Sequence, residues 1–393
     1  MRAGGAKCRK RLRESDFYVM IQREDTARCP LPPRAAIYVR TDVLQRNYRR
    51  VAALAREKGG RQVRLFAVVK ANAYGHDARL AVPAFLAAGC RDFAVATPEE
   101  GFAVRETAPR ANILVLGYSP PAIAAEMAAA NLTQTVFSPA YADDLARAAR
   151  RAGVRLAVHV KIDTGMHRLG FSPEDVDKIY VAARREGLFP TGIFTHFPAP
   201  REKEETAAAH AAFTRCRAAL SAKGLALFSH AAASGALLSQ ESIPEDGVRS
   251  GILLYGYTPG GKPFAPALTL TAPLIQCRRL FAGERAGYGG AFRAEGATTV
   301  GILPLGYADG LPRALAGLPV TVRHENRAYP AALAAICMDQ CLVDLGDAPA
   351  AAGDAVTLWQ NAALPAKRLG TIPYEVLAAL SPRVPRIAVK EKE

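Results

Sequence analysis

Short apolar runs alternate with longer amphipathic stretches over the first part of the chain. Eight of these runs have the length and composition of buried strands; they are residues 65–69, 93–96, 113–116, 133–137, 156–162, 191–195, 226–229 and 248–253. The stretches that separate them have helical spacing; they are residues 78–88, 99–106, 120–130, 139–152, 173–186 and 204–223. Eight strands that alternate with helices predict an α/β fold, a (β/α)8 barrel of the TIM type. One more helix, over residues 41–58, is predicted to precede the first strand.

The pattern changes after residue 257, where apolar runs become short and are separated by Gly, Pro and Asp turns. The predicted strands there are residues 268–275, 298–304, 320–322, 331–336, 341–345 and 355–359, and only residues 374–380 are predicted to be helical. We therefore expect a barrel domain over residues 35–260 and a smaller C-terminal all-β domain over residues 261–388. Residues 1–34 are predicted to be a disordered extension, or the product of a start codon assigned too early.

Composition narrows the class of protein. The 393 residues are 50% hydrophobic and 22% charged, which suits a globular chain with two domains. The formal charge of +15 comes mainly from scattered arginines. Because no compact basic stripe with interleaved aromatic residues is present, nucleic acid is not an expected partner. The charge favours anionic ligands such as phosphates and carboxylates instead.

Cysteine usage and hydropathy bear on the compartment. The seven cysteines are dispersed and lack the spacing of a metal-binding motif, which favours a reducing compartment and no metal site. The chain has no run of about 18 apolar residues, so no membrane association is expected. The basic N-terminus is not followed by an apolar segment, so no secretory signal is predicted. We expect a cytoplasmic protein.

The segment Phe66-Ala-Val-Val-Lys70-Ala-Asn-Ala-Tyr74-Gly-His76 carries the first candidate for chemistry. A lysine at the end of a buried strand is partly desolvated, which lowers its pKa and makes the neutral amine available to attack carbonyl groups. Most lysines in such a position are merely solvated. The unusual sequence that follows Lys70 favours the functional interpretation.

Other reactive residue types also follow predicted barrel strands, and in this architecture the chemistry collects at the C-terminal ends of the strands. They are Lys70, Arg168, His196, Ser234 and Arg249. The loops after the seventh and eighth strands commonly bind a phosphate group in this fold. Ser234 and the backbone amides of Gly251 and Ile252 are donors at that position. We therefore expect an anion site beside Lys70.

Several segments, in the order in which they occur, resemble the alanine racemase family, the fold-type III amino-acid racemases. They are residues 66–76, 158–171, 246–256, 286–290, 303–313, 336–340, 374–375 and 382–386. The resemblance spans about residues 36–387 and draws on both predicted domains. It implies pyridoxal 5'-phosphate (PLP) as cofactor and interconversion of L-alanine and D-alanine, with a role in supplying D-alanine for peptidoglycan.

The resemblance also implies a role for each matched residue. Lys70 would bind PLP covalently and act as one base, and Tyr288 would be the second base, on the opposite face. The residues expected to contact the cofactor are Lys70, Tyr74, His196, Ser234, Arg249, Gly251, Ile252 and Tyr374. The substrate carboxylate would meet Arg168 and the backbone amide of Met338. The family further implies a homodimer in which the partner subunit supplies Tyr288 and Met338.

The chemistry of racemisation agrees with two bases. A proton leaves one face of the α-carbon and another is added to the opposite face, so a base must stand on each side. A free phenol has a pKa of about 10 and is a poor base at neutral pH. Positive charge from Arg168 and His196 would favour the phenolate of Tyr288. A cation such as Arg249 at the pyridine nitrogen of PLP would keep that nitrogen unprotonated.

Three positions leave alternatives open. Lys161 is expected to share a strand face with Asp163 and could pair with it; the resemblance equally allows a carbamylated lysine that orients Arg168. Ala233 stands where the family usually has asparagine, and Arg201 stands where an acidic residue often lines the substrate entrance. These two departures leave serine, or a broader range of amino acids, as possible substrates.

Two other classes of function are considered. A fold-type III amino-acid decarboxylase shares the lysine motif, but those enzymes have an acid at the pyridine nitrogen, which Arg249 and Tyr288 disfavour. A non-catalytic PLP carrier would need neither the second domain nor Tyr288.

Overall fold

The computed structural model describes residues 33–60, 62–258 and 264–390. Two units can be distinguished: Thr41–Ala267 forms one, and the segment that ends at Arg40 forms the other together with the chain from Leu268 onward. Apart from its last two residues, the predicted N-terminal extension lies outside the described residues. Residues 259–263 also lie outside them, so the domain boundary near residue 260 stays a prediction.

The first unit is built on a closed barrel of parallel strands, in which each strand pairs with the next and β9 pairs with β2. The strands are β2 (Arg64–Val68), β3 (Asp92–Val95), β4 (Asn112–Val115), β5 (Leu132–Val136), β6 (Leu156–Lys161), β7 (Leu188–Phe194), β8 (Phe228–Ala233) and β9 (Gly247–Ser250). The predicted TIM barrel is confirmed. The eighth strand ends earlier than predicted because its apolar continuation forms the 3-10 helix η2 (Ile252–Tyr255).

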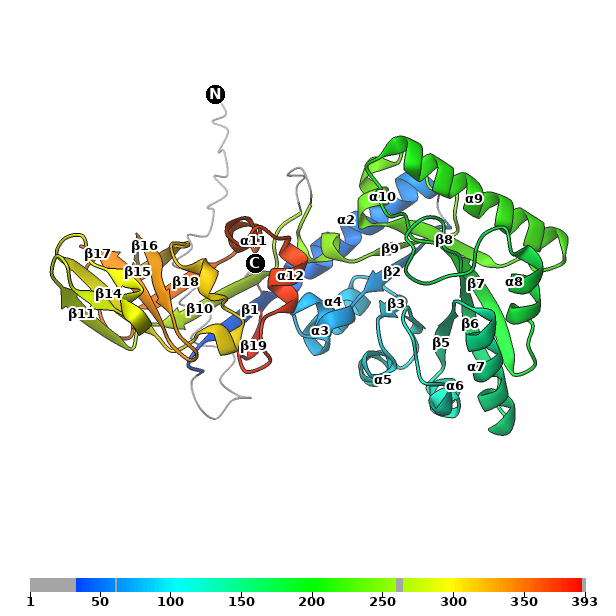
Figure 1. Cartoon of the computed structure of the whole chain (residues 1–393), viewed down its shortest axis with the longest axis horizontal. Helices are drawn as coiled ribbons and strands as arrows, with labels where there is room; N and C mark the ends of the chain where they lie inside the picture. The colour runs from blue at the N-terminus through cyan, green and yellow to red at the C-terminus, as the bar shows by residue number, and fades with distance from the viewer. Residues whose placement is uncertain (1–32, 61, 259–263, 391–393) are drawn as a thin grey trace, which may run out of the picture. The chain divides into compact units, whose positions relative to one another are not determined.

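One helix, α2, precedes the first barrel strand, and further helices follow the strands to form the outer layer (Figure 1). They are α2 (Thr41–Gly59), α4 (Ala78–Ala87), α5 (Pro98–Thr107), η1 (Pro121–Ile123), α6 (Ala124–Ala129), α7 (Pro139–Arg151), α8 (Val176–Ala183) and α9 (Lys203–Ala222). Local sequence explains where some of them begin. Ser138 accepts a hydrogen bond from the Tyr141 amide at 3.2 Å, and Pro139 occupies the first turn of α7. Two short elements, the left-handed turn α3 (Lys70–Tyr74) and the helix α10 (Ser234–Ser239), were not predicted, because five or six residues carry no recognisable period.

The barrel interior combines apolar side chains with a small polar group. Phe66, Phe194 and Phe228 lie in aromatic contact with His230. His230 is fully buried, and Arg249 on the adjacent strand is only 4% exposed. Charged and imidazole groups at such depth need hydrogen-bond partners, because burial without them is costly.

The second unit is a nine-stranded sheet with the order β11-β14-β17-β16-β15-β18-β10-β1-β19. Its strands are β1 (Ala36–Arg40), β10 (Leu268–Pro273), β11 (Gln276–Leu280), β14 (Thr298–Leu303), β15 (Pro319–His324), β16 (Arg327–Ile336), β17 (Cys341–Gly346), β18 (Ala355–Trp359) and β19 (Arg386–Val389). A separate hairpin joins β12 (Arg285–Ala286) and β13 (Phe292–Arg293). The sheet-rich second domain is therefore confirmed.

Two details of the second unit differ from the sequence-based expectation. Strand β1 pairs with β10 and β19 in the sheet, although residues from 35 onward were expected in the barrel domain. An isolated apolar strand carries no local signal for the sheet that it joins. The prediction of a single helix after residue 260 is wrong, because α11 (Ala363–Leu369) accompanies α12 (Pro373–Ala378).

Candidate active site

Lys70 lies two residues after the end of β2, at the C-terminal end of the barrel strands. Val68 and Val69 before it are buried, and its own side chain is half-buried. Burial holds the pKa of the Lys70 amine below its usual value, and the positive charge of Arg168 acts in the same direction, while the carboxylate of Glu100 opposes both. A lowered pKa increases the neutral, nucleophilic fraction of the amine at a given pH.

The backbone after Lys70 adopts an uncommon conformation. Ala71, Asn72, Ala73 and Tyr74 have φ values of 52°, 51°, 55° and 52°, which form one left-handed turn. For residues other than glycine, this conformation costs about 1–2 kcal/mol each. Hydrogen bonds hold the turn, including one from the Ala78 amide to Asn72 Oδ1 at 2.8 Å. Strain of this kind persists only where the surrounding structure enforces it, and it often marks a functional site.

Hydroxyl groups and amides gather where β8 and β9 end. Ser234 Oγ accepts a hydrogen bond from the Gly251 amide at 3.1 Å and lies 3.2 Å from Ser250 Oγ. A Cβ atom at Gly251 would approach Tyr74 Oη to 2.3 Å, so the Tyr74 hydroxyl lies directly against this glycine. The first turn of η2 starts at Ile252, beside them. The cluster offers several donors to an anion; Ser250 is a member that the sequence reasoning missed.

The Arg249 guanidinium is held by five hydrogen bonds inside the barrel. Nη1 donates to His230 Nδ1 at 2.6 Å and to the His230 carbonyl at 3.0 Å. Nη2 donates to the Thr195 carbonyl at 2.7 Å, to the Ala231 carbonyl at 3.1 Å and to His196 Nδ1 at 3.4 Å. Burial lowers the pKa of Arg249 to about 10. The guanidinium is therefore fixed in direction, and its charge is compensated mainly by carbonyl dipoles.

The bond from Arg249 sets the proton positions on two buried histidines. Arginine can only donate, so His230 Nδ1 must accept, and His230 Nε2 must carry the proton. That proton points to His159 Nδ1 at 2.8 Å, which leaves the remaining proton of His159 on Nε2. Gly192 makes room for this ring, because a Cβ there would lie 2.5 Å from His159 Nε2. The hydrogen bonds therefore all point in one direction: Arg249 donates to His230, and His230 donates to His159. Both imidazoles are neutral.

Both of these histidines resist protonation. Burial lowers the pKa of His159 to about 3, with Arg64 and Arg249 acting in the same direction. Burial also places the pKa of His230 well below its ordinary value. The third histidine, His196, has its pKa lowered to about 3 by burial and by the charges of Arg249 and Arg168. All three are neutral at physiological pH, so His196 adds no positive charge there.

Lys161 and Arg168 extend the positive charge at this end of the barrel. Burial lowers the pKa of Lys161 to about 8, and Arg168 and Arg249 act in the same direction. Within the described residues, no ion pair joins Lys161 to Asp163. Asp163 Oδ1 instead accepts from two amides of its own loop, those of Gly165 and His167, each at 3.1 Å. This loop carries the exposed Arg168.

Three predicted site residues belong to the sheet unit. Tyr288 begins the short turn η3 (Tyr288–Gly290), and its side chain is 81% exposed. Met338 follows β16 and is 53% exposed. Tyr374 lies in α12, and burial raises its pKa. The barrel unit thus assembles Lys70, Tyr74, His196, Ser234, Arg249, Gly251 and Ile252, while these three residues lie on the other unit.

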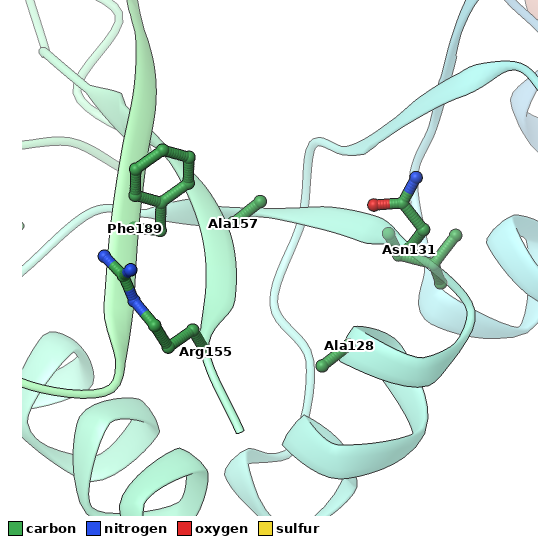
Figure 2. A pocket seen from close by; sticks show the side chains of 6 residues that line it. Ala128, Asn131, Arg155, Ala157 and Phe189 are labelled. Atoms are coloured by element: carbon green, nitrogen blue, oxygen red, sulfur yellow. The ribbon is translucent and has the colours of Figure 1, made fainter. Parts of the chain in front are cut away.

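A cavity of about 210 Å³ opens at the opposite end of the barrel, where β5, β6 and β7 begin. Figure 2 shows Arg155 and Phe189 on one side of it and Asn131 and Ala128 on the other. The Arg155 guanidinium lies 4.9 Å from the centre of the Phe189 ring. Because active sites of this fold occupy the other end of the strands, this cavity is not the candidate site.

Metal-binding clusters and membrane-spanning helices are both absent from the described part of the chain. No group of three or more His, Cys, Asp or Glu side chains there could hold a metal ion. No helix among those residues is both long and apolar enough to span a bilayer.

Both parts of the chain match models of one known protein family. The model of the alanine racemase N-terminal domain matches residues 39–259, and the model of the C-terminal domain matches residues 267–388. The chain belongs to the alanine racemase family. A curated relative, alanine racemase 1 of Clostridium acetobutylicum, is 34% identical over 348 residues, which cover 84% of this chain and 90% of that protein.

Solved structures of alanine racemases share the whole fold. The alanine racemase of Bacillus anthracis with bound L-Ala-P has a TM-score of 0.84 and 28% identity, covering 92% of this chain and 96% of that one. The alanine racemase of Bartonella henselae, with covalently bound pyridoxal phosphate, has a TM-score of 0.80 and 27% identity, covering 91% of this chain and all of that one. This family member is therefore an amino-acid racemase, an isomerase, and the decarboxylase alternative is not supported.

Proposed function

We propose that this racemase interconverts L-alanine and D-alanine with PLP as cofactor. The observation that carries the proposal is the half-buried Lys70 amine, with its lowered pKa, at the same end of the barrel as the cluster of hydroxyl and amide donors. The names of the curated relatives support alanine as the substrate. The pyridoxal phosphate bound covalently in the Bartonella henselae enzyme supports the cofactor.

The residues present fit a phosphate-bearing pyridoxal group. Gly251 lacks a Cβ where one would strike Tyr74 Oη, so a phosphate can approach the amides of Gly251 and Ile252 closely. Ser234 would add a hydroxyl donor. We propose that Tyr374 also binds this phosphate. Arg249, fixed by carbonyls and His230, would face the pyridine nitrogen. Because a guanidinium only donates, it would favour a pyridine nitrogen that carries no proton.

When bound, PLP would supply an electron sink that makes the substrate α-proton more acidic. Lys70 would hold the cofactor and take or return a proton on one face of the substrate. Tyr288 would do the same on the other face, because a change of configuration needs a base on each side. Arg168 and the Met338 amide would bind the substrate carboxylate, which fixes the α-carbon between the two bases.

We further propose that the active form is a homodimer in which Tyr288 and Met338 of a second copy complete the site. Lys161 also enters the proposal. Its pKa of about 8 leaves a usable fraction of neutral amine, which can add carbon dioxide and release a proton to form a carbamate. The carbamate anion would lie among the positive charges of Arg168, Arg249 and Lys70, and it would orient Arg168. The supply of D-alanine for peptidoglycan stays a prediction.

The test uses purified full-length protein with PLP and L-alanine, followed by chiral chromatography. We expect D-alanine to accumulate until both enantiomers are equal, since they have the same free energy. L-serine and L-lysine run in parallel measure the breadth that Ala233 and the exposed Arg201 leave open. Release of carbon dioxide from lysine or ornithine without any D-alanine would contradict the proposal.

A further inference from the structure

The N-terminus of α5 carries an unusual version of a common capping arrangement. Its sequence Thr97-Pro-Glu-Glu100 matches the capping box, in which the side chain at the first position binds the fourth residue's amide and the fourth side chain reaches back to the first residue's amide. The first half is present, because Thr97 Oγ1 accepts from the Glu100 amide at 3.4 Å. The second half is not. The Glu100 carboxylate is directed elsewhere.

Both oxygens of Glu100 are used on backbone amides outside its own helix. Oε2 accepts from the Ala96 amide, just after β3, at 2.8 Å. Oε1 accepts from the Ala71 amide at 2.6 Å, the shorter of the two bonds. Charge-assisted bonds of this length are stronger than those between neutral groups. One carboxylate therefore ties the chain after β2 to the chain after β3.

Ala71 is the residue where this tie matters. It directly follows Lys70, and it is the first of the four residues in the left-handed turn. The first amides of a turn have no acceptor within it, so an outside acceptor decides whether they are satisfied. Relaxation of Ala71 toward an ordinary conformation would rotate the peptide that joins it to Lys70. The lysine side chain would then leave the barrel mouth in a different direction.

The charge of Glu100 also acts on Lys70. Among the described groups that shift the lysine pKa, burial and Arg168 favour the neutral amine, whereas Glu100 favours the ammonium. The negative charge of Glu100 thus partly compensates the positive charge of Lys70 in a region that also holds the cations of Lys161 and Arg249. Position and charge of the lysine depend on the same side chain.

We propose that Glu100 is the positioning residue of Lys70: its carboxylate binds the Ala71 and Ala96 amides together and so holds the strained turn that directs the lysine. The inference rests on the proposed function only in assigning the chemistry to Lys70. The two hydrogen bonds of Glu100 do not depend on that assignment.

The main variant is Glu100→Gln, with Glu99→Gln as its matched control. Glutamine has one acceptor oxygen and can satisfy only one of the two amides. Glu99 is exposed, lies one residue away, and its replacement removes the same charge from the same helix end. Hydrogen exchange of the 70–76 segment is measured on the full-length chain, together with kcat and KM for racemisation. We expect exchange to become about 10- to 100-fold faster and kcat to fall by a similar factor, with KM within about twofold. Glu99→Gln should match the wild type in both.

A second variant, Glu100→Asp, separates the effect of Glu100 on the position of Lys70 from its effect on the charge of Lys70. It also replaces Glu100→Gln if that variant fails to fold. Aspartate keeps the charge but is one methylene too short to span both amides. We expect fast exchange of the 70–76 segment, as in Glu100→Gln. Labelling of Lys70 in the cofactor-free full-length chain by an amine reagent should keep its wild-type pH midpoint in Glu100→Asp, and the midpoint should move to lower pH in Glu100→Gln.

Wild-type exchange of residues 70–76 in both Glu100 variants would overturn the inference, whatever the catalytic activity. A wild-type kcat combined with fast exchange would also overturn it, because the turn would then not direct the lysine. Failure of the proposed function would look different. In that case Lys70→Ala would keep racemising, while the exchange result for Glu100 would stand.

Discussion

The two units present their predicted site residues in opposite ways. In the barrel, Arg249 is 4% exposed and held by five hydrogen bonds, and Lys70 is set by a strained turn. In the sheet unit, Tyr288 is 81% exposed on a short turn, and Met338 is 53% exposed. The positions of the barrel residues are fixed by contacts within their own unit. The side chains of Tyr288 and Met338 are exposed, so other contacts would have to fix their positions. Changes to the barrel should therefore affect cofactor binding, and changes at Tyr288 should affect the chemistry alone.

The largest expected effect comes from Lys70→Ala. Under the proposed function it would remove both the covalent attachment of the cofactor and one base, so we expect racemisation to fall by about 10⁴-fold or more. The absorbance band of the covalently bound cofactor should disappear as well. Lys178→Ala is the control, because Lys178 is exposed on α8, where it pairs with Asp175. Substantial turnover in Lys70→Ala would show that the barrel does not supply the reactive amine.

A smaller effect is expected from Gly251→Ala. The added Cβ would lie 2.3 Å from Tyr74 Oη, and the Tyr74 ring cannot easily retreat because it is buried against Tyr255, with centroids 4.8 Å apart. Overpacking of this kind costs about 1–3 kcal/mol, so the dissociation constant for PLP should rise about 10- to 100-fold. Equilibrium titration of the cofactor-free full-length protein measures it.

The double variant Gly251→Ala with Tyr74→Phe sharpens this test. Loss of the hydroxyl removes the closest contact and leaves Cζ of the ring 2.9 Å from the added Cβ, so the clash is eased in part. The double variant should therefore bind PLP more tightly than additive effects of the two single changes would allow. Wild-type affinity in Gly251→Ala would mean that the cluster does not hold the phosphate.

Acid sensitivity of the barrel should depend on its buried histidines. The pKa of His159 is about 3 in the folded protein and 6.5 when it is unperturbed. Between these values the unfolded chain binds the extra proton, so stability falls as pH is lowered from 6.5 toward 3. At pH 5, the low pKa of His159 reduces the free energy of unfolding by about 2 kcal/mol relative to its value at neutral pH. Urea unfolding of wild type and His159→Gln at pH 7.5 and 5 should show a smaller pH dependence in the variant.

His210→Gln tests the sign of that argument. A hydrogen bond to Glu245 raises the pKa of His210, so this residue stabilises the fold below pH 6.5 and loses the effect as pH rises through its folded pKa. Its removal should therefore make the protein more acid-sensitive, the reverse of His159→Gln. Equal pH dependence in His159→Gln and wild type would mean that His159 is not held neutral in the folded state.

Much of the barrel could be predicted because its signals are local. Apolar runs that alternate with stretches of helical spacing predicted eight strands in order, and positions at their ends pointed to Lys70, Ser234 and Arg249. The left-handed turn could not be predicted, since Ala71 and Ala73 have no preference for positive φ and are forced into it by contacts made later in the chain. Ser250, and the histidine pair with Gly192 behind it, also arise only when distant strands become neighbours.

The sheet unit was harder for the same reason. Strand β1 enters it from the far end of the sequence, and its partner β19 lies near the C-terminus. In the barrel, pairing with Asp163 was one of two alternatives for Lys161; the described residues show no such ion pair, because Asp163 accepts hydrogen bonds from two amides of its own loop.

We expect Lys70 and Tyr288 to serve opposite faces of one substrate, and the variant Tyr288→Phe separates the two roles. The measurement follows deuterium uptake from heavy water at the α-carbon of L-alanine and of D-alanine, together with inversion, on the full-length protein with its cofactor. We predict an intact cofactor band, no inversion in either direction, and uptake with retained configuration for only one enantiomer, the one whose α-proton faces Lys70. Inversion of both enantiomers at the wild-type rate would show that Tyr288 is not one of the two bases.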